Sequence, residues 1–221
     1  MKRIHNAGTG EVVEKKSRFI ADVYDLTDEE QALHYINETK KKYWDARHHC
    51  YAYVIGEKNE IRRFSDDGEP SGTAGKPVLE VIDRSGVCNC LIIVTRYFGG
   101  TLLGTGGLIR AYTAAAKAGL DNAGVMEVRR GVTAPLAPRV DADYNSLGKL
   151  QYICADEGAV IRNIDYGENV QLELLIELSA YADFQKRLTD VFGAKLSAVK
   201  INEAIYGVFD GEVKIISENC E

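Results

Sequence analysis

The sequence predicts an α+β protein of two domains, residues 1–131 and 132–221. Three observations lead to this fold class. The 221 residues exceed one domain of about 100 residues, and 45% of them are hydrophobic, enough to build two cores. In the first part, strand and helix patterns surround two glycine-rich loops. From Val132 onward the patterns follow the order β-α-β-β-α-β, which is that of a ferredoxin-like domain.

The first domain begins with two strand patterns within residues 11–25, broken at a basic run, and continues into a helix. Thr27 is expected to be the N-cap of that helix, because Glu30 stands three residues later, as in a capping box. Leu33 and Ile36 supply apolar positions on one face of the helix.

A hairpin is expected next, with strands over residues 49–55 and 60–65. Residues 66–76 are too rich in glycine and too poor in apolar periodicity for a regular element, so they should form a structured loop. Pro77 suits the first turn of a helix. The apolar run over residues 91–95 then predicts a central strand, buried on both faces.

A second glycine-rich loop, residues 99–107, follows the central strand and leads into a helix that should end near Gly119. Leu108 and Tyr112 are expected on its inward face. Arg110 is expected on another face, where it could extend an anion contact at the start of the helix.

In the second domain we expect four strands, two helices and an additional edge strand after Tyr206. The strands are residues 132–137, 160–166, 169–178 and 199–205, and the helices are residues 144–157 and 180–192. A turn over residues 166–169 should join the two middle strands as a hairpin.

The composition excludes several classes of protein. The chain starts without an apolar signal segment, and no stretch approaches the roughly 18 uninterrupted apolar residues of a membrane span, so we expect a cytoplasmic protein without a membrane partner. The five cysteines are odd in number and form no C-x-x-C pair. Neither a disulfide framework nor a zinc site is therefore indicated, and no cofactor or metal is expected.

The net charge of −6 is unevenly distributed. Residues 1–131 hold 19 Lys and Arg against 18 Asp and Glu, whereas residues 132–221 hold 8 against 15. The two parts therefore carry +1 and −7. A nucleic acid would be expected to meet the first part, where a local basic face can form.

The two glycine loops carry a long motif. It reads DDGEPSGTAGKP over Asp66–Pro77 and TRYFGGTLLGTGGLIRAY over Thr95–Tyr112. This pairing closely resembles the signature of the IMPACT/YigZ family. The resemblance implies a first domain similar to ribosomal protein S5 domain 2 and to domain IV of EF-G, and a second domain similar to domain V of EF-G. It also implies that eukaryotic relatives regulate translation through protein partners, whereas bacterial relatives lack an established activity.

Three carboxylates, Asp66, Asp67 and Glu69, lie within four residues. They could hold a hard cation such as Mg²⁺ or place an acid beside a base. The alternative is that they simply form a solvated turn, since Asp and Asp-Gly are common turn residues. The sequence lacks a calcium-loop spacing, so the turn is the preferred interpretation.

The segment from Gly72 to Lys76 resembles a phosphate loop in part. Successive N–H groups before a helix could cradle an anion, with Thr73 in the loop and Lys76 to neutralise the charge. The Walker pattern fails, because Pro70 stands where its first glycine is needed and Pro77 follows the lysine. A simple anion site and a tightly packed turn remain the alternatives.

Arg96, Tyr97 and Phe98, followed by Gly99 and Gly100, form the most suggestive group. A guanidinium and two aromatic rings at the end of a central strand could grip phosphate and stack on bases of single-stranded RNA. Because neighbouring strand residues point opposite ways, one of the two rings is expected in the core. The alternative is that Arg96 pairs with a loop carboxylate such as Asp66 or Asp67.

His48, His49 and Cys50 suggest a metal site or a Cys-His nucleophile, but no further ligand is visible, so they are interpreted as strand residues. The preferred function is a non-catalytic binding protein associated with RNA or the ribosome. A regulator that contacts a translation-related protein is the second hypothesis. The third is a metal-assisted enzyme acting on a phosphorylated small molecule.

Overall fold

The protein forms two compact units, described here from a computed structural model that covers residues 1–138, 144–166, 170–193, 196–200 and 202–219. The first unit comprises Met1–Glu127 with Val208–Glu212, and the second comprises Val128–Gly207 with Val213–Glu221. The α+β fold class is confirmed. The expected domain boundary after residue 131 falls inside strand β7 (Val125–Pro138) and stays a prediction.

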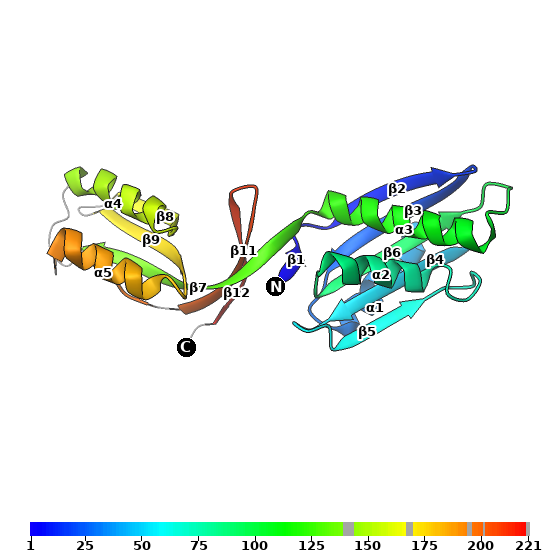
Figure 1. Cartoon of the computed structure of the whole chain (residues 1–221), viewed down its shortest axis with the longest axis horizontal. Coiled ribbons are helices and arrows are strands. Elements are labelled where there is room, and N and C mark those ends of the chain that lie inside the picture. The colour runs from blue at the N-terminus through cyan, green and yellow to red at the C-terminus, as the bar shows by residue number, and fades with distance from the viewer. Residues whose placement is uncertain (139–143, 167–169, 194–195, 201, 220–221) are drawn as a thin grey trace. The chain divides into compact units, whose positions relative to one another are not determined.

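A five-stranded antiparallel sheet forms the first unit (Figure 1). Its order is β2 (Gly8–Glu14), β3 (Ser17–Asp25), β6 (Cys90–Tyr97), β4 (His48–Ile55) and β5 (Ile61–Ser65). The predicted hairpin is confirmed as β4–β5, and the two strands predicted within residues 11–25 pair as a second hairpin, β2–β3. The predicted central strand is β6, in which every residue up to Arg96 is buried. Its end therefore lies in the middle of the sheet.

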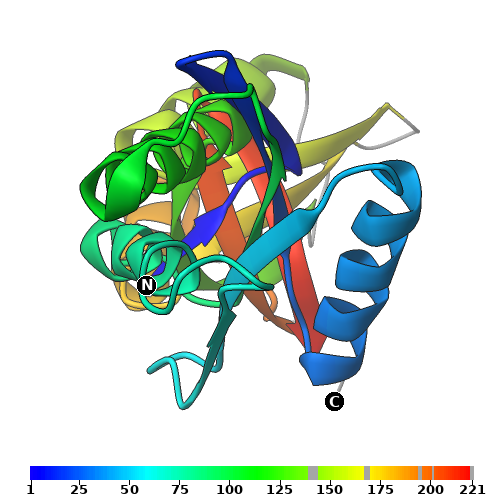
Figure 2. The same ribbon diagram turned by 90° about the vertical axis from the view of Figure 1, so that its right-hand side faces the viewer.

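Helices cover both faces of this sheet, which explains why β6 is apolar on both sides. They are α2 (Gly75–Ser85) and α3 (Gly104–Ala123) on one face and α1 (Glu29–Lys42) on the other (Figure 1 and Figure 2). Ile92 and Val94 pack in the larger core beneath α2 and α3, whereas Leu91 and Ile93 pack in the smaller core beneath α1.

Helix α1 begins one residue later than predicted. Asp28 is its N-cap, and the Asp28 carboxylate accepts a hydrogen bond from the Gln31 N–H at 2.8 Å. The Gln31 side chain in turn accepts a hydrogen bond from the Thr27 N–H. The start of the helix is therefore capped by Asp28 and Gln31, and not by the predicted capping box of Thr27 and Glu30. The prediction for Leu33 is wrong, because its side chain is 53% exposed, whereas Ile36 is buried as expected.

The second unit has the ferredoxin-like order expected from its sequence pattern. β7 lies between β10 (Leu196–Ala198) and β9 (Val170–Glu177), and β8 (Val160–Tyr166) pairs with β9. The core of the unit packs beneath two helices, α4 (Tyr144–Asp156) and α5 (Tyr181–Phe192). β11 (Asn202–Phe209) follows on the other side of β7, and β12 (Glu212–Asn219) pairs with β11. The short strand β1 (Lys2–Ile4) belongs to the first unit and pairs with the start of β7.

Two details of the second unit differ from expectation. The single strand predicted over residues 199–205 is replaced by β10 and β11, and the edge strand expected after Tyr206 is confirmed as β12. The predicted turn at 166–169 includes residues 167–169, which lie outside the described residues.

Within the described ranges, no helix has the length and apolar character needed to cross a membrane. The cytoplasmic location stays a prediction.

Candidate binding surface at the glycine loops

The two glycine loops meet through a buried ion pair. Arg96, at the end of β6, donates from Nη1 to the Glu69 carboxylate at 2.6 Å, and the Tyr112 hydroxyl of α3 donates to the same oxygen at 2.9 Å. The side chains of Arg96 and Glu69 are only 7% and 4% exposed. The guanidinium also lies over the rings of Phe19 and Phe98. Arg96 therefore holds the loops together, in a pair with Glu69 and not with Asp66 or Asp67.

Asp66 organises the first loop from inside. Its carboxylate accepts three backbone hydrogen bonds, from Gly72 at 2.8 Å, Ala74 at 3.0 Å and Gly75 at 2.8 Å. These N–H groups include the N-terminus of α2, where a negative charge is favourable. The anion site proposed for residues 72–76 is thus already filled by the protein's own Asp66.

The other residues of the first loop are also held by local bonds. The Asp67 carboxylate accepts from the His49 N–H at 2.7 Å and lies 3.4 Å from the Lys40 ammonium. The Thr73 hydroxyl is buried and donates to the Pro70 carbonyl at 2.7 Å. Lys76 is exposed on the first turn of α2.

Each of the three carboxylates of the first loop is bound by donors of the protein itself. Asp66 and Asp67 bind backbone N–H groups, and Glu69 binds Arg96, so each carboxylate faces a different donor. Across the described part of the chain, no group of three or more His, Cys, Asp or Glu side chains is arranged to hold a metal ion. The alternative of a turn with solvated carboxylates is wrong for Glu69, because Glu69 is buried.

The expectation that either Tyr97 or Phe98 lies in the core is wrong. Strand β6 ends at Tyr97, so strand alternation does not extend to Phe98, which is 52% exposed. Tyr97 is partly exposed and donates its hydroxyl hydrogen to Asp45 at 2.7 Å, and Arg18 lies over its ring. Both rings therefore belong to the surface at this end of the sheet.

The glycines that follow Phe98 fit the second loop against the β2–β3 turn. The Gly99 N–H donates to the buried Ser17 hydroxyl at 3.0 Å, and a Cβ atom on Gly99 would lie 2.1 Å from the carbonyl carbon of Lys16. Gly100 has a φ of +85°. The two lysines of the turn, Lys15 and Lys16, are thereby placed beside the second loop.

A pocket of about 430 Å³ opens between the two loops. Its residues come from the start of β4, the first loop, the end of β6, the second loop and the beginning of α3. They are Arg47, His48, Glu69, Pro70, Arg96, Phe98, Leu102, Leu103, Gly104, Thr105 and Leu108. The His48 Nδ1 lies 2.8 Å from the Asp67 carbonyl oxygen, so this nitrogen carries the proton. Arg110 is exposed on α3 but does not line the pocket.

Exposed apolar and basic side chains line this pocket or belong to the segments beside it, and several were not selected from the sequence. Trp44 is 81% exposed and Leu102 is 83% exposed. Trp44 precedes Asp45, whose bond to Tyr97 ties this segment to the end of β6. We call this surface the loop face; it consists of Lys15, Lys16, Trp44, Arg47, Phe98 and Leu102. The sequence signal available for this segment is the single tryptophan of the protein, with Arg47 three residues later.

The cysteine beside this site is not an activated nucleophile. Cys50 is buried, and its thiol donates to the Asp66 carbonyl and the Tyr112 hydroxyl. Burial raises the pKa of the Cys50 thiol far above its ordinary value, and the hydrogen bond between this thiol and Tyr112 only partly opposes the effect. The interpretation of His48, His49 and Cys50 as strand residues is confirmed, since all three lie in β4.

We expect Cys50 and Cys154 to resist alkylation in the folded protein, because both are buried. Burial raises the pKa of Cys154 to about 11, which leaves at least about 100-fold less thiolate at pH 8 than a free cysteine has. Iodoacetamide labelling, mapped by mass spectrometry, should modify Cys50 and Cys154 rapidly only after unfolding in urea. Rapid labelling of native Cys50 would instead indicate an activated thiol.

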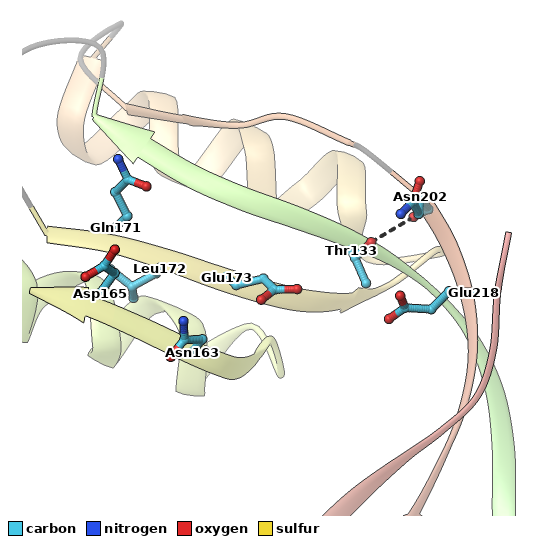
Figure 3. Close-up of a pocket in the computed structure, with 8 residues that line it drawn as sticks. All are labelled: Thr133, Asn163, Asp165, Gln171, Leu172, Glu173, Asn202 and Glu218. Carbon is cyan, nitrogen blue, oxygen red and sulfur yellow. Dashed lines mark hydrogen bonds between the residues drawn. The ribbon is translucent and has the colours of Figure 1, made fainter. Parts of the chain in front are cut away.

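The second unit has a pocket of a different character. Figure 3 shows this pocket of about 300 Å³ on the sheet, with side chains from β7, β8, β9, β11 and β12. Asp165, Glu173 and Glu218 line it together with amide side chains and Thr133. Arg162 bonds to both Glu173 and Glu218, at 3.0 and 2.7 Å. The single positive charge of Arg162 is thus shared between two of the three carboxylates, and the pocket keeps a net negative charge.

Comparisons with known proteins agree with this two-part architecture. The profile described as "Impact N-terminal domain" matches residues 15–120, and the "Domain of unknown function (DUF1949)" matches residues 140–195. The chain is 39% identical to the IMPACT family member YvyE of Bacillus subtilis over 203 residues, 92% of this chain and 91% of YvyE. The chain belongs to the IMPACT family.

Other relatives of this IMPACT family chain cover similar lengths. It is 35% identical to YigZ of Escherichia coli over 196 residues, 86% of the chain and 92% of YigZ. A crystal structure described as that of a hypothetical protein covers 90% of the chain and is itself covered to 96%, with 31% identity and a TM-score of 0.55. The family predicted from the two glycine loops is confirmed, and the N-terminal match contains the whole loop face.

Proposed function

We propose that this IMPACT family protein is a non-catalytic binding protein that associates with RNA, free or in the ribosome, through the loop face of its first unit. Its role in translation follows from the resemblance to translation-regulating relatives. The proposal that Arg96 itself contacts phosphate is replaced, because Arg96 is buried against Glu69. The contact is assigned instead to the exposed side chains around it.

The observation that carries this proposal is the mixture of rings and cations on the loop face. Trp44 and Phe98 are exposed aromatic residues, and single-stranded nucleic acids bind proteins by stacking bases on such rings. Lys15, Lys16 and Arg47 are exposed and make no ion pair among the residues that the structure describes. Their charges are therefore available to phosphate groups.

Charge also distinguishes the two parts of the chain. Residues 132–221 carry −7, and the pocket of the second unit is lined by three carboxylates. A polyanion is repelled by such a surface and attracted by the local positive charge of the loop face. RNA binding is therefore assigned to the first unit alone.

We expect a single-stranded RNA oligonucleotide to quench the fluorescence of Trp44, which is the only tryptophan of the protein. With three available cations, the slope of log K against log salt should be about −2, which weakens binding roughly 20-fold between 50 and 200 mM salt. Arg47→Ala should reduce this slope by about 0.7. Titrations of the wild type and the variant over this salt range measure both quantities.

Arg84→Ala provides the matched control. Arg84 is an exposed arginine of the same unit, paired with Glu80 on α2 and outside the loop face. This variant should bind RNA as the wild type does. The proposal fails if the wild type shows no RNA binding at 50 mM salt, or if the Arg84 and Arg47 variants weaken binding equally.

A protein partner is the second candidate, favoured by the 83% exposure of Leu102 beside a largely apolar pocket. Exposed apolar patches mark protein contacts as well as nucleic-acid contacts. In this case a translation-related protein should be recovered with the chain after nuclease treatment, and Leu102→Ala should abolish its recovery. Leu33→Ala, which removes an exposed leucine from α1, is the control.

A further inference from the structure

We infer that the pocket between the glycine loops is a site for one unstacked nucleotide, with its phosphate at the N-terminus of α3 and its base against Phe98 and Leu102. This inference rests on the proposed RNA binding and assigns a specific ligand to the pocket. The loop face supplies general contacts, whereas the pocket would take a single residue of the RNA chain.

The N-terminus of α3 provides the donors. The first N–H groups of a helix have no partner within the helix, and they carry a partial positive charge. No side chain caps this end of α3, and no acidic residue lies in its first turn. Gly104 and Thr105, the first two residues of α3, are exposed and line the pocket, so this helix end lies at the pocket wall. The corresponding end of α2 is closed by Asp66.

A buried donor of Arg96 that lacks an acceptor is a second and independent indication of a polar ligand group in the pocket. Arg96 lines the pocket, is 7% exposed, and donates from Nη1 to Glu69, but its Nε has no hydrogen-bond partner. An unpaired buried donor is costly, since the great majority of such groups are satisfied. The negative charge of Glu69 balances the positive charge of Arg96. Arg47 therefore adds a further positive charge to the lining of the pocket.

The other walls suit a base. Phe98, Leu102, Leu103 and Leu108 make an apolar lining on the side of the second loop. Phe98 is 52% exposed, so its ring is accessible for stacking. A volume of about 430 Å³ lies within the range of about 300–1,000 Å³ typical of small-ligand sites. A phosphate alone would leave the apolar lining uncovered.

Thr105 allows a test that changes charge without disturbing the fold. It is exposed in the first turn of α3, where a carboxylate favours the helix, so Thr105→Glu should fold normally. Its negative charge would oppose a phosphate at the same helix end. Thr105→Gln has nearly the same shape without the charge, and it is the matched control. Thermal unfolding of both variants verifies that the fold is intact.

Adenosine 5′-monophosphate, adenosine and inorganic phosphate are the probes, followed through the amide resonances of Gly104, Thr105 and Gly106. The monophosphate should shift these resonances in the wild type and in Thr105→Gln with affinities within about twofold. Thr105→Glu should lower the affinity for the monophosphate at least about tenfold, because two negative charges would lie a few ångströms apart. Inorganic phosphate should bind about 5- to 150-fold more weakly, since it lacks a base to stack.

RNA binding is measured on the same three proteins, which separates the two proposals. If RNA binds and the monophosphate leaves the α3 amides unshifted, the nucleotide site is overturned and the loop face stands. Equal affinity of the Thr105→Glu and Thr105→Gln variants for the monophosphate also overturns the site. If phosphate binds as tightly as the monophosphate, the pocket holds only an anion and the base contact is overturned.

Discussion

Replacing Glu69 by alanine is expected to lower the free energy of unfolding by about 3–5 kcal/mol, because it leaves the Arg96 guanidinium buried without its counter-charge. The Tyr112 hydroxyl would lose its acceptor at the same time. Urea denaturation followed by circular dichroism measures the change. A loss below about 1 kcal/mol would mean that water or another group replaces Glu69.

Two further variants test whether the charge is the cause. Glu80→Ala removes one partner of an exposed pair with Arg84, at 3.7 Å on α2, and should cost at most about 0.5 kcal/mol. The double variant Glu69→Leu with Arg96→Met should recover much of the lost stability, since apolar replacement of a buried pair is often neutral. Failure of this rescue would assign the pair a role in shaping the loops.

The same pair determines how RNA binding must be tested. Arg96→Ala would leave Glu69 buried and unpaired, so the variant would lose stability whether or not Arg96 contacts RNA. A loss of binding in that variant would be ambiguous. Arg47 and Thr105 are exposed, and their substitution alters the surface without opening the core.

Gly99→Ala is expected to cost about 3 kcal/mol, the upper part of the range for overpacking. The added Cβ would lie 2.1 Å from the Lys16 carbonyl carbon and 2.3 Å from the Ser17 nitrogen. Both are backbone atoms, which cannot rotate away as a side chain can. The second loop would have to move, and the Gly99 bond to the buried Ser17 hydroxyl would be lost.

Gly100→Ala is the control for this prediction. A Cβ on Gly100 would meet open space, but its φ of +85° is unfavourable for alanine. The expected cost is about 1 kcal/mol, from backbone strain alone. Thermal or urea unfolding compares the two variants. Equal costs would show that the loop adapts to the added methyl group and that close approach is not the reason for glycine at residue 99.

Most secondary structure could be predicted from the sequence, because its causes lie within a few residues of one another. The uninterrupted apolar run of β6 predicted a strand covered on both faces, and α2 and α3 cover one face while α1 covers the other. The β-α-β-β-α-β order likewise predicted the arrangement of the second unit. The errors fell at helix ends and surfaces, where Asp28 replaced Thr27 as the cap and Leu33 faced solvent.

The candidate site was predicted in part. The sequence predicts that the two loops belong to one motif and allows Arg96 to pair with a loop carboxylate, but it does not distinguish Glu69 as the counter-ion. Three carboxylates at nearly adjacent positions look equivalent in a sequence. In the folded protein Asp66 faces the start of α2 and Glu69 reaches the end of β6, because the turn between them points their side chains in different directions.

The sequence by itself determined the family, the α+β class and the two loops, because a long motif and local hydrogen-bonding periodicity need no knowledge of distant contacts. Only the tertiary structure decided that Arg96 is buried, that Asp66 fills the first loop, and that Arg47 and the second loop line one pocket. Burial and charge pairing depend on residues that are far apart in the chain, and folding alone brings these residues together.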